Sequence, residues 1–92
     1  MGAMSVSSAF AALADPTRRQ IIAFLADGEQ PVAMICEQFN CTAPAVSQHL
    51  KVLRETGLVT VRPAAQKRYY AVNKPALSEV AAWLSGMAGL ER

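Results

Sequence analysis

The stretch Thr42–Val59 reads TAPAVSQHLKVLRETGLV, and it predicts one helix with both ends marked. Thr42 is a candidate N-cap, because its hydroxyl can accept a hydrogen bond from a free backbone N–H of the first turn. Gly57 can adopt the left-handed conformation that ends a helix. The apolar residues between these ends recur at the spacing of a single helical stripe: Val46, Leu50 and Leu53. We therefore expect a helix that is buried along this stripe.

The other face of this predicted helix, over residues 42–56, carries small and polar side chains with little bulk. Such a face can enter the major groove of DNA, where side chains form hydrogen bonds with base edges. A solvated surface is the alternative interpretation of the same pattern. His49 lies near the buried edge, where it either contacts DNA or braces the helix. The residues of this helix that we expect to contact DNA are Thr42, Ala43, Pro44, Ser47, Gln48, His49, Lys51 and Arg54.

Length and composition indicate a single small domain. The chain has 92 residues, of which 52% are hydrophobic and 17% are charged. A small protein with this apolar excess often buries part of it in an oligomer interface. We assign residues 4–92 to the domain and interpret residues 1–3 as a remnant of an expression tag. No run of about 18 apolar residues is long enough to span a membrane and no signal peptide is evident, so we expect the protein in the cytoplasm.

Positive charge is concentrated on the predicted helix and just after it. The net charge is only +2, yet five of the nine Lys and Arg residues lie within residues 51–72, against one acidic residue. A local excess of this kind is typical of a surface that binds phosphate groups.

Beyond Gly57 the hydrophobic pattern changes to that of a β-hairpin, with strands over residues 58–62 and 67–72 and a turn at 63–66. A two-stranded hairpin is marginal alone, so it must pack on the helices. A basic hairpin beside a DNA-reading helix is the wing of a winged helix. The cations that we expect to contact phosphate or the minor groove from this wing are Arg62, Lys67 and Arg68.

Three shorter helices are expected before the stretch, over residues 8–13, 16–26 and 31–39. Asn40 can adopt a left-handed turn after the third, which leaves only Cys41 before the next helix begins. Two helices joined so tightly, the second with a polar outer face, match a helix-turn-helix.

Two cations of the second helix lie at an unfavourable position. Asp15 and Pro16 mark the start of this helix as N-cap and first residue. Arg18 and Arg19 follow in the first turn, where the helix dipole disfavours positive charge. We expect them to bind a phosphate or a carboxylate, with a solvated pair as the alternative.

A last helix is expected from Asn73, its N-cap, to about Met87. Few charges remain on this helix, which favours burial of more than one face. The pattern favours a dimer contact that this helix shares with the first helix, with packing on its own core as the alternative. The residues expected at this interface are Phe10, Leu13, Leu77, Val80, Trp83 and Leu84.

Three motifs together resemble the ArsR family of bacterial winged-helix repressors. The matching runs are Ala14–Arg19, Ala45–Val59 and Lys67–Tyr70, and they occur in the order and at the spacing of the family. The resemblance implies a mainly α-helical winged helix-turn-helix, with four helices, a small β-hairpin and a fifth helix. It also implies a homodimer whose recognition helices lie in the major grooves of a two-fold symmetric DNA operator, in a bacterial cytoplasm.

The chain departs from the metal-sensing members of that family. Residues 30–35, where many members carry a Cys-x-Cys pair, contain no cysteine, and the last helix has Glu79 but no histidine. Zinc requires about four N, S or O ligands, which we cannot assemble here, so we expect no metal and no cofactor. The wing also lacks the glycine common at its tip. These features resemble the small autorepressors of the family.

Cys36 and Cys41 leave a second interpretation open, in which a thiol switch controls the protein. A disulfide between them would distort the helix-turn-helix, although a buried cysteine is ordinary.

The main hypothesis is a dimeric repressor that occludes a promoter. The alternatives are an effector- or thiol-responsive sensor of the same fold and a winged helix that binds protein. We expect no enzyme, because the only histidine has no nucleophile paired with it and no glycine-rich phosphate loop occurs.

Overall fold

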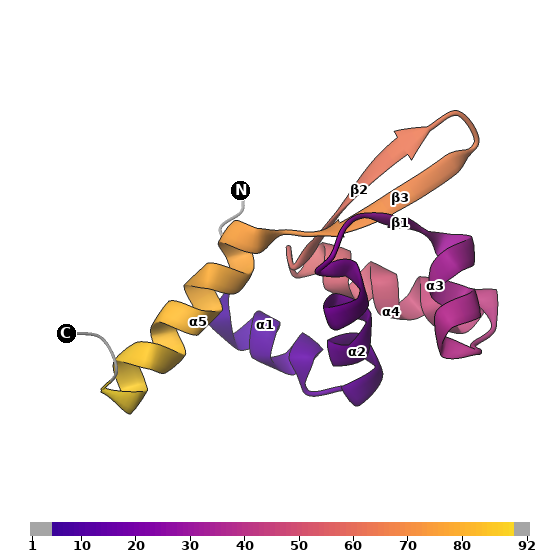
Figure 1. The fold of residues 1–92 in the computed structure, drawn as a ribbon. Helices are drawn as coiled ribbons and strands as arrows, with labels where there is room; N and C mark the ends of the chain where they lie inside the picture. The colour runs from indigo at the N-terminus through magenta and orange to yellow at the C-terminus, as the bar shows by residue number, and fades with distance from the viewer. Residues whose placement is uncertain (1–4, 90–92) are drawn as a thin grey trace.

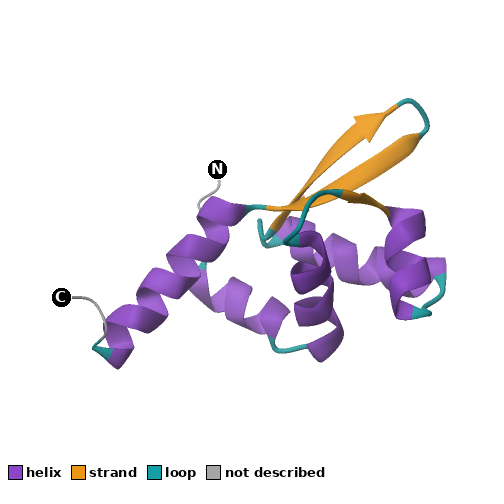
Figure 2. Cartoon of the chain, viewed as in Figure 1, coloured by secondary structure: helices purple, strands orange, loops and turns teal. Residues whose placement is uncertain are grey.

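The computed structural model describes residues 5–89, so the interpretation of residues 1–3 falls outside it (Figure 1). Five helices and three short strands follow one another in the order α1 (Val6–Leu13), α2 (Pro16–Leu25), β1 (Gln30–Pro31), α3 (Val32–Phe39), α4 (Ala43–Glu55), β2 (Val59–Ala64), β3 (Lys67–Val72) and α5 (Lys74–Ala88). Helices make up most of the described chain, and the strands gather on one side of it (Figure 2). None of these helices combines the length and the hydrophobicity needed to cross a bilayer.

The core lies where helices α2, α3 and α4 meet the sheet. The predicted stripe of α4 is fully buried there, since Val46, Leu50 and Leu53 are at most 1% exposed. Helix α5 extends away from this core on one side, and the β2–β3 hairpin extends on the other (Figure 1). The largest side chains buried alongside the α4 stripe are Ile21, Leu25, Ile35 and Leu58.

The sheet has one strand more than the sequence indicated. Gln30 and Pro31 form β1, which pairs antiparallel with Tyr70 and Tyr69 of β3, so the strand order is β1-β3-β2. A strand of two residues is too short to show an alternating hydrophobic pattern in the sequence. Gln30 and Pro31 are extended because they pair with the free edge of β3. Pro31 does not open the third helix as predicted. It precedes that helix instead, because α3 begins at Val32.

The boundaries of α1 and β2 also differ from those expected. Helix α1 begins at Val6 rather than at residue 8, because the Ser5 hydroxyl accepts a hydrogen bond from the backbone N–H of Ser8 at 3.3 Å. Strand β2 begins at Val59 rather than at residue 58 and continues to Ala64, so the wing turn shortens from residues 63–66 to the pair Ala65 and Gln66. Ala65 adopts a φ of 57°, which supplies the left-handed geometry that glycine usually provides.

Candidate nucleic-acid interface

The turn between α3 and α4 is as tight as expected. Asn40 adopts a φ of 51°, and its N–H donates to the carbonyl of Cys36. Two residues later the Thr42 hydroxyl accepts a hydrogen bond from the N–H of Ala45 at 3.3 Å. The left-handed turn and the N-cap together fix the direction in which α4 leaves the turn.

Helix α4 presents a continuous polar face to solvent. The buried stripe occupies one side, and every residue of this helix that we expect to contact DNA is exposed, except the half-buried His49. Small side chains occupy the first turn, where Ala43 and Pro44 follow the cap. A helix end without bulk can approach base edges closely, which suits its entry into a major groove.

Arg18 and Arg19 donate to backbone carbonyls in this structure, and no carboxylate of the described residues forms an ion pair with either side chain. The Arg18 Nε donates to the carbonyl of Ala12 at 2.6 Å, and Arg19 Nη1 donates to the carbonyl of Leu13 at 2.7 Å. These carbonyls belong to the last turn of α1, where they have no partner within the helix. Both arginines therefore cap α1, and neither was recognisable from sequence because the two segments meet only in the folded chain.

His49 connects α4 to Arg18, at the junction of α1 and α2. Its Nδ1 lies 3.5 Å from Nη1 of Arg18, in reach of a weak hydrogen bond. The same junction holds Asp15, whose carboxylate accepts hydrogen bonds from the N–H groups of Arg18 and Thr17 at 3.1 and 2.8 Å. The hydrogen bond from the Arg18 N–H is the largest cause that keeps the pKa of the Asp15 carboxyl below its ordinary value.

The three cations of the wing have different surroundings. Lys67 and Arg68 are exposed near the tip. Arg62 is bound within its own chain, since its Nε donates to Glu29 Oε2 at 3.2 Å and its Nη2 donates to Glu29 Oε1. Hydrogen bonds from Arg62 lower the pKa of Glu29, and the same pairing raises the pKa of Arg62. Glu29 was not predicted as the partner of Arg62, because the two residues are 33 positions apart in the sequence.

Helix α5 carries exposed apolar side chains along its outer side. Trp83 is 45% exposed and Leu84 is 49% exposed, and Met87 beside them is 68% exposed. The Trp83 ring meets Phe10 of α1 edge to face, with the ring centroids 5.4 Å apart. Val80 departs from the expected interface, because it is 5% exposed and belongs to the core of its own chain. Leu13 and Leu77 are half-buried against the same core.

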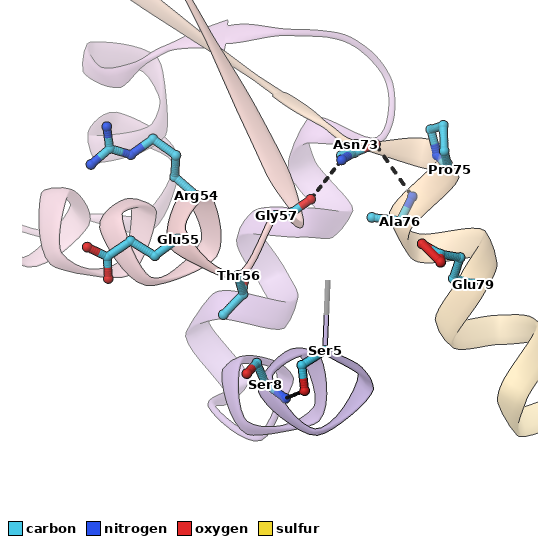
Figure 3. Close-up of a pocket in the computed structure, with 10 residues that line it drawn as sticks. All are labelled: Ser5, Ser8, Arg54, Glu55, Thr56, Gly57, Asn73, Pro75, Ala76 and Glu79. Carbon is cyan, nitrogen blue, oxygen red and sulfur yellow. Dashed lines mark hydrogen bonds between the residues drawn. The ribbon is translucent and has the colours of Figure 1, made fainter. Parts of the chain in front are cut away.

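A cavity of about 640 Å³ lies between the end of α4, the start of α5 and the start of α1 (Figure 3). Asn73 joins two of these elements, since its amide N–H donates to the carbonyl of Gly57 at 2.8 Å and its amide oxygen caps α5. Glu79 of α5 lines this cavity, together with Ser8 of α1 and its N-cap Ser5 (Figure 3). The position of α5 is therefore tied directly to the end of α4.

The two cysteines are free and half-buried. The thiol of Cys41 donates to the carbonyl of Phe39 at 3.2 Å within the α3–α4 turn, and Cys36 packs against the core. Within residues 5–89, no three His, Cys, Asp or Glu side chains come together in a way that could hold a metal ion.

Comparisons with known proteins agree with this geometry. Residues 15–61 match the family model described as "Bacterial regulatory protein, arsR family". The chain is 32% identical over 79 residues to the transcriptional repressor SdpR of Bacillus subtilis, a match that covers 86% of this chain and 88% of SdpR. It is 43% identical over 74 residues to the HTH-type transcriptional regulator Rv2034 of Mycobacterium tuberculosis, with 80% and 69% of the two chains covered. The crystal structure of an ArsR family transcriptional regulator superposes with a TM-score of 0.83 at 29% identity, covering 95% of this chain and 98% of the other.

Proposed function

Because the chain belongs to the arsR family of bacterial regulatory proteins, DNA-binding regulators of transcription with a winged helix-turn-helix, we propose that it is a homodimeric repressor of a two-fold symmetric operator. The observation that carries this proposal is the polar face of α4, which is exposed along its length while the opposite stripe is fully buried. A helix held in this way can lie in a major groove without any rearrangement of the core.

In the proposed complex α4 reads the bases. Gln48 is exposed on the outer face and can form two hydrogen bonds with an adenine, and Ser47 beside it can reach a base or a phosphate. Thr42 and the small residues after it lie at the helix end that enters the groove. Lys51 and Arg54, further along the exposed face, bind the flanking phosphates.

In the same complex the wing contacts the neighbouring backbone. Lys67 and Arg68 are exposed next to the two-residue turn, where nothing in the described chain neutralises them. Their charge adds affinity that does not depend on base sequence, because each phosphate contact releases condensed counterions.

The proposed dimer joins α1 and α5 of one protomer to those of its partner. Exposed Trp83, Leu84 and Met87 form an apolar surface that a second copy can cover. A two-fold dimer places two copies of α4 about one or two helical turns apart on the DNA. A protein bound in this way over a promoter excludes the polymerase, so the proposed regulation is repression.

Selection of duplexes from a random pool by the purified protein tests the proposal. We expect a two-fold symmetric site, and a reporter gene that carries this site should be silenced when the protein is produced. The Gln48→Ala variant should lose preference at one base position in each half-site, whereas Gln20→Ala, an exposed glutamine of α2, should select the wild-type site. Failure to bind any duplex at low salt would contradict the proposal, as would activation of the reporter.

A further inference from the structure

A single side chain connects three segments at the base of the wing. Arg62 of β2 donates two hydrogen bonds to Glu29, which lies just before β1, and its guanidinium carbon lies 4.9 Å from the centre of the Tyr69 ring of β3. We call these three residues the wing clamp. The two parallel hydrogen bonds fix the orientation of both charged groups, which a single contact would not do.

The clamp lies on the side of the hairpin that faces away from the helices. Side chains along a strand point alternately to the two faces of the sheet. Arg62 is paired with Tyr69 in the register, so these two side chains share one face. Pro63 is paired with Arg68, so these two share the other face. Arg68 therefore shares a face with the buried Tyr70, and it lines a groove of about 430 Å³ with Val32 and other residues at the start of α3. Arg62 and Arg68 project from opposite faces of the same hairpin.

We propose that Arg62 positions the wing and does not contact DNA, whereas Arg68 on the opposite face does. This inference rests on the proposed function, in which the wing lies against the DNA backbone. On this proposal Arg62 is paired with a carboxylate of its own chain, whereas Lys67 and Arg68 remain available to bind phosphate.

The geometry explains why the wing needs such a contact. A two-stranded hairpin has little stability of its own, and the wing tip extends beyond β1, which pairs only with Tyr69 and Tyr70 of β3 (Figure 1). Ala65 at the tip is three residues from Arg62, which corresponds to about 10 Å along a strand. A tilt of about 10° at the clamp would therefore move the tip by about 2 Å, enough to break a hydrogen bond to phosphate. A surface ion pair contributes modestly to stability, so loss of the clamp should loosen the hairpin locally and leave the rest of the fold intact.

Operator binding across a range of salt concentrations separates the two roles of the wing arginines. Arg62→Gln and Glu29→Gln should each weaken binding by about threefold without changing the slope of log affinity against log salt. Arg68→Gln should lower that slope by about one unit, since it removes one phosphate contact. The double reversal Glu29→Arg with Arg62→Glu keeps the net charge, and it should recover most of the affinity that Arg62→Glu alone loses.

Hydrogen exchange in the free protein gives a second readout that requires no DNA. Amide protons of β2 and β3 should exchange faster in Glu29→Gln and in Arg62→Gln than in the wild type, while Arg68→Gln should leave them unchanged. If the proposed function is wrong, the wild-type protein will bind no operator. The exchange experiment would still show whether Arg62 and Glu29 hold the hairpin in place.

Three outcomes would overturn the inference. The first is a tighter and more salt-sensitive complex with Glu29→Gln, which would mean that Glu29 withholds Arg62 from phosphate. The second is a double reversal that stays as weak as Arg62→Glu alone. The third is unchanged exchange in both clamp variants.

Discussion

Truncation of Leu84 to alanine should weaken the proposed dimer without unfolding the protomer. Leu84 lies on α5 and is 49% exposed, so its side chain contributes little to the core of its own chain. In a two-fold interface the same residue is lost from both protomers at once. The variant therefore removes apolar surface from the contact between copies and leaves the fold of each copy intact.

The size of the effect follows from the exposed half of the side chain. Complete burial of a leucine stabilises by about 1.5–3 kcal/mol, so the half that a partner can still cover accounts for about 1 kcal/mol. Two copies give about 2 kcal/mol, which corresponds to a roughly thirtyfold increase in the dissociation constant of the dimer.

Sedimentation equilibrium over a wide range of protein concentrations measures this constant. Met34→Ala is the matched control, because Met34 is a 43% exposed apolar residue on α3, remote from the proposed interface. Dimerisation should be unchanged in the control, whereas for Leu84→Ala operator binding should weaken in parallel with dimerisation, since a monomer contacts only one half-site.

The reasoning would be refuted if Leu84→Ala dimerised like the wild type while remaining folded. Wild-type protein that stays monomeric at every concentration would refute it more broadly. Equal loss of dimer in Met34→Ala would place the interface elsewhere on the surface.

Three further predictions concern single charged or thiol groups. Replacement of Arg68 by alanine should weaken binding to all duplexes alike and lower the salt slope by about one unit, as titrations at several salt concentrations would show. The Asp15 carboxylate has a lowered pKa in the folded state, so its stabilisation is complete above about pH 4 and is lost as the pH falls through the lower folded value. Thermal unfolding between pH 6 and pH 2 should therefore be less pH-dependent for Asp15→Asn, which keeps an N-cap without a charge. Under the thiol-switch hypothesis, peroxide should weaken operator binding by the wild type but not by Cys41→Ser, and equal wild-type affinities with and without peroxide would reject that switch.

Local chemistry was sufficient to predict the parts of the fold that depend on neighbours in sequence. The apolar stripe of α4 is buried as its spacing indicated, and Thr42 caps the helix with its hydroxyl. Asn40 adopts the left-handed turn and Asn73 caps α5, both as predicted. Each of these features requires interactions within about four residues, which a periodic pattern can reveal.

The features that were missed depend on segments far apart in sequence. Strand β1 exists only because β3 offers it an edge, and the partner of Arg62 is Glu29, which no pattern connects to the wing. The Arg18 side chain donates to a carbonyl near the end of α1, a contact that no local pattern indicates because the side chain and the carbonyl meet only in the folded chain. Val80 fell on the expected dimer stripe, yet packing within its own chain buries it.

Methylation interference on the selected operator tests most directly whether α4 lies in the major groove. Guanine N7 faces the major groove, so methylation at this atom should block binding at positions in two symmetric half-sites, about one or two helical turns apart. Substitution of Gln48, which we propose contacts an adenine, should leave the spacing of the two half-sites unchanged. Binding that tolerates N7 methylation throughout the site would contradict the central claim that this helix reads DNA from the major groove.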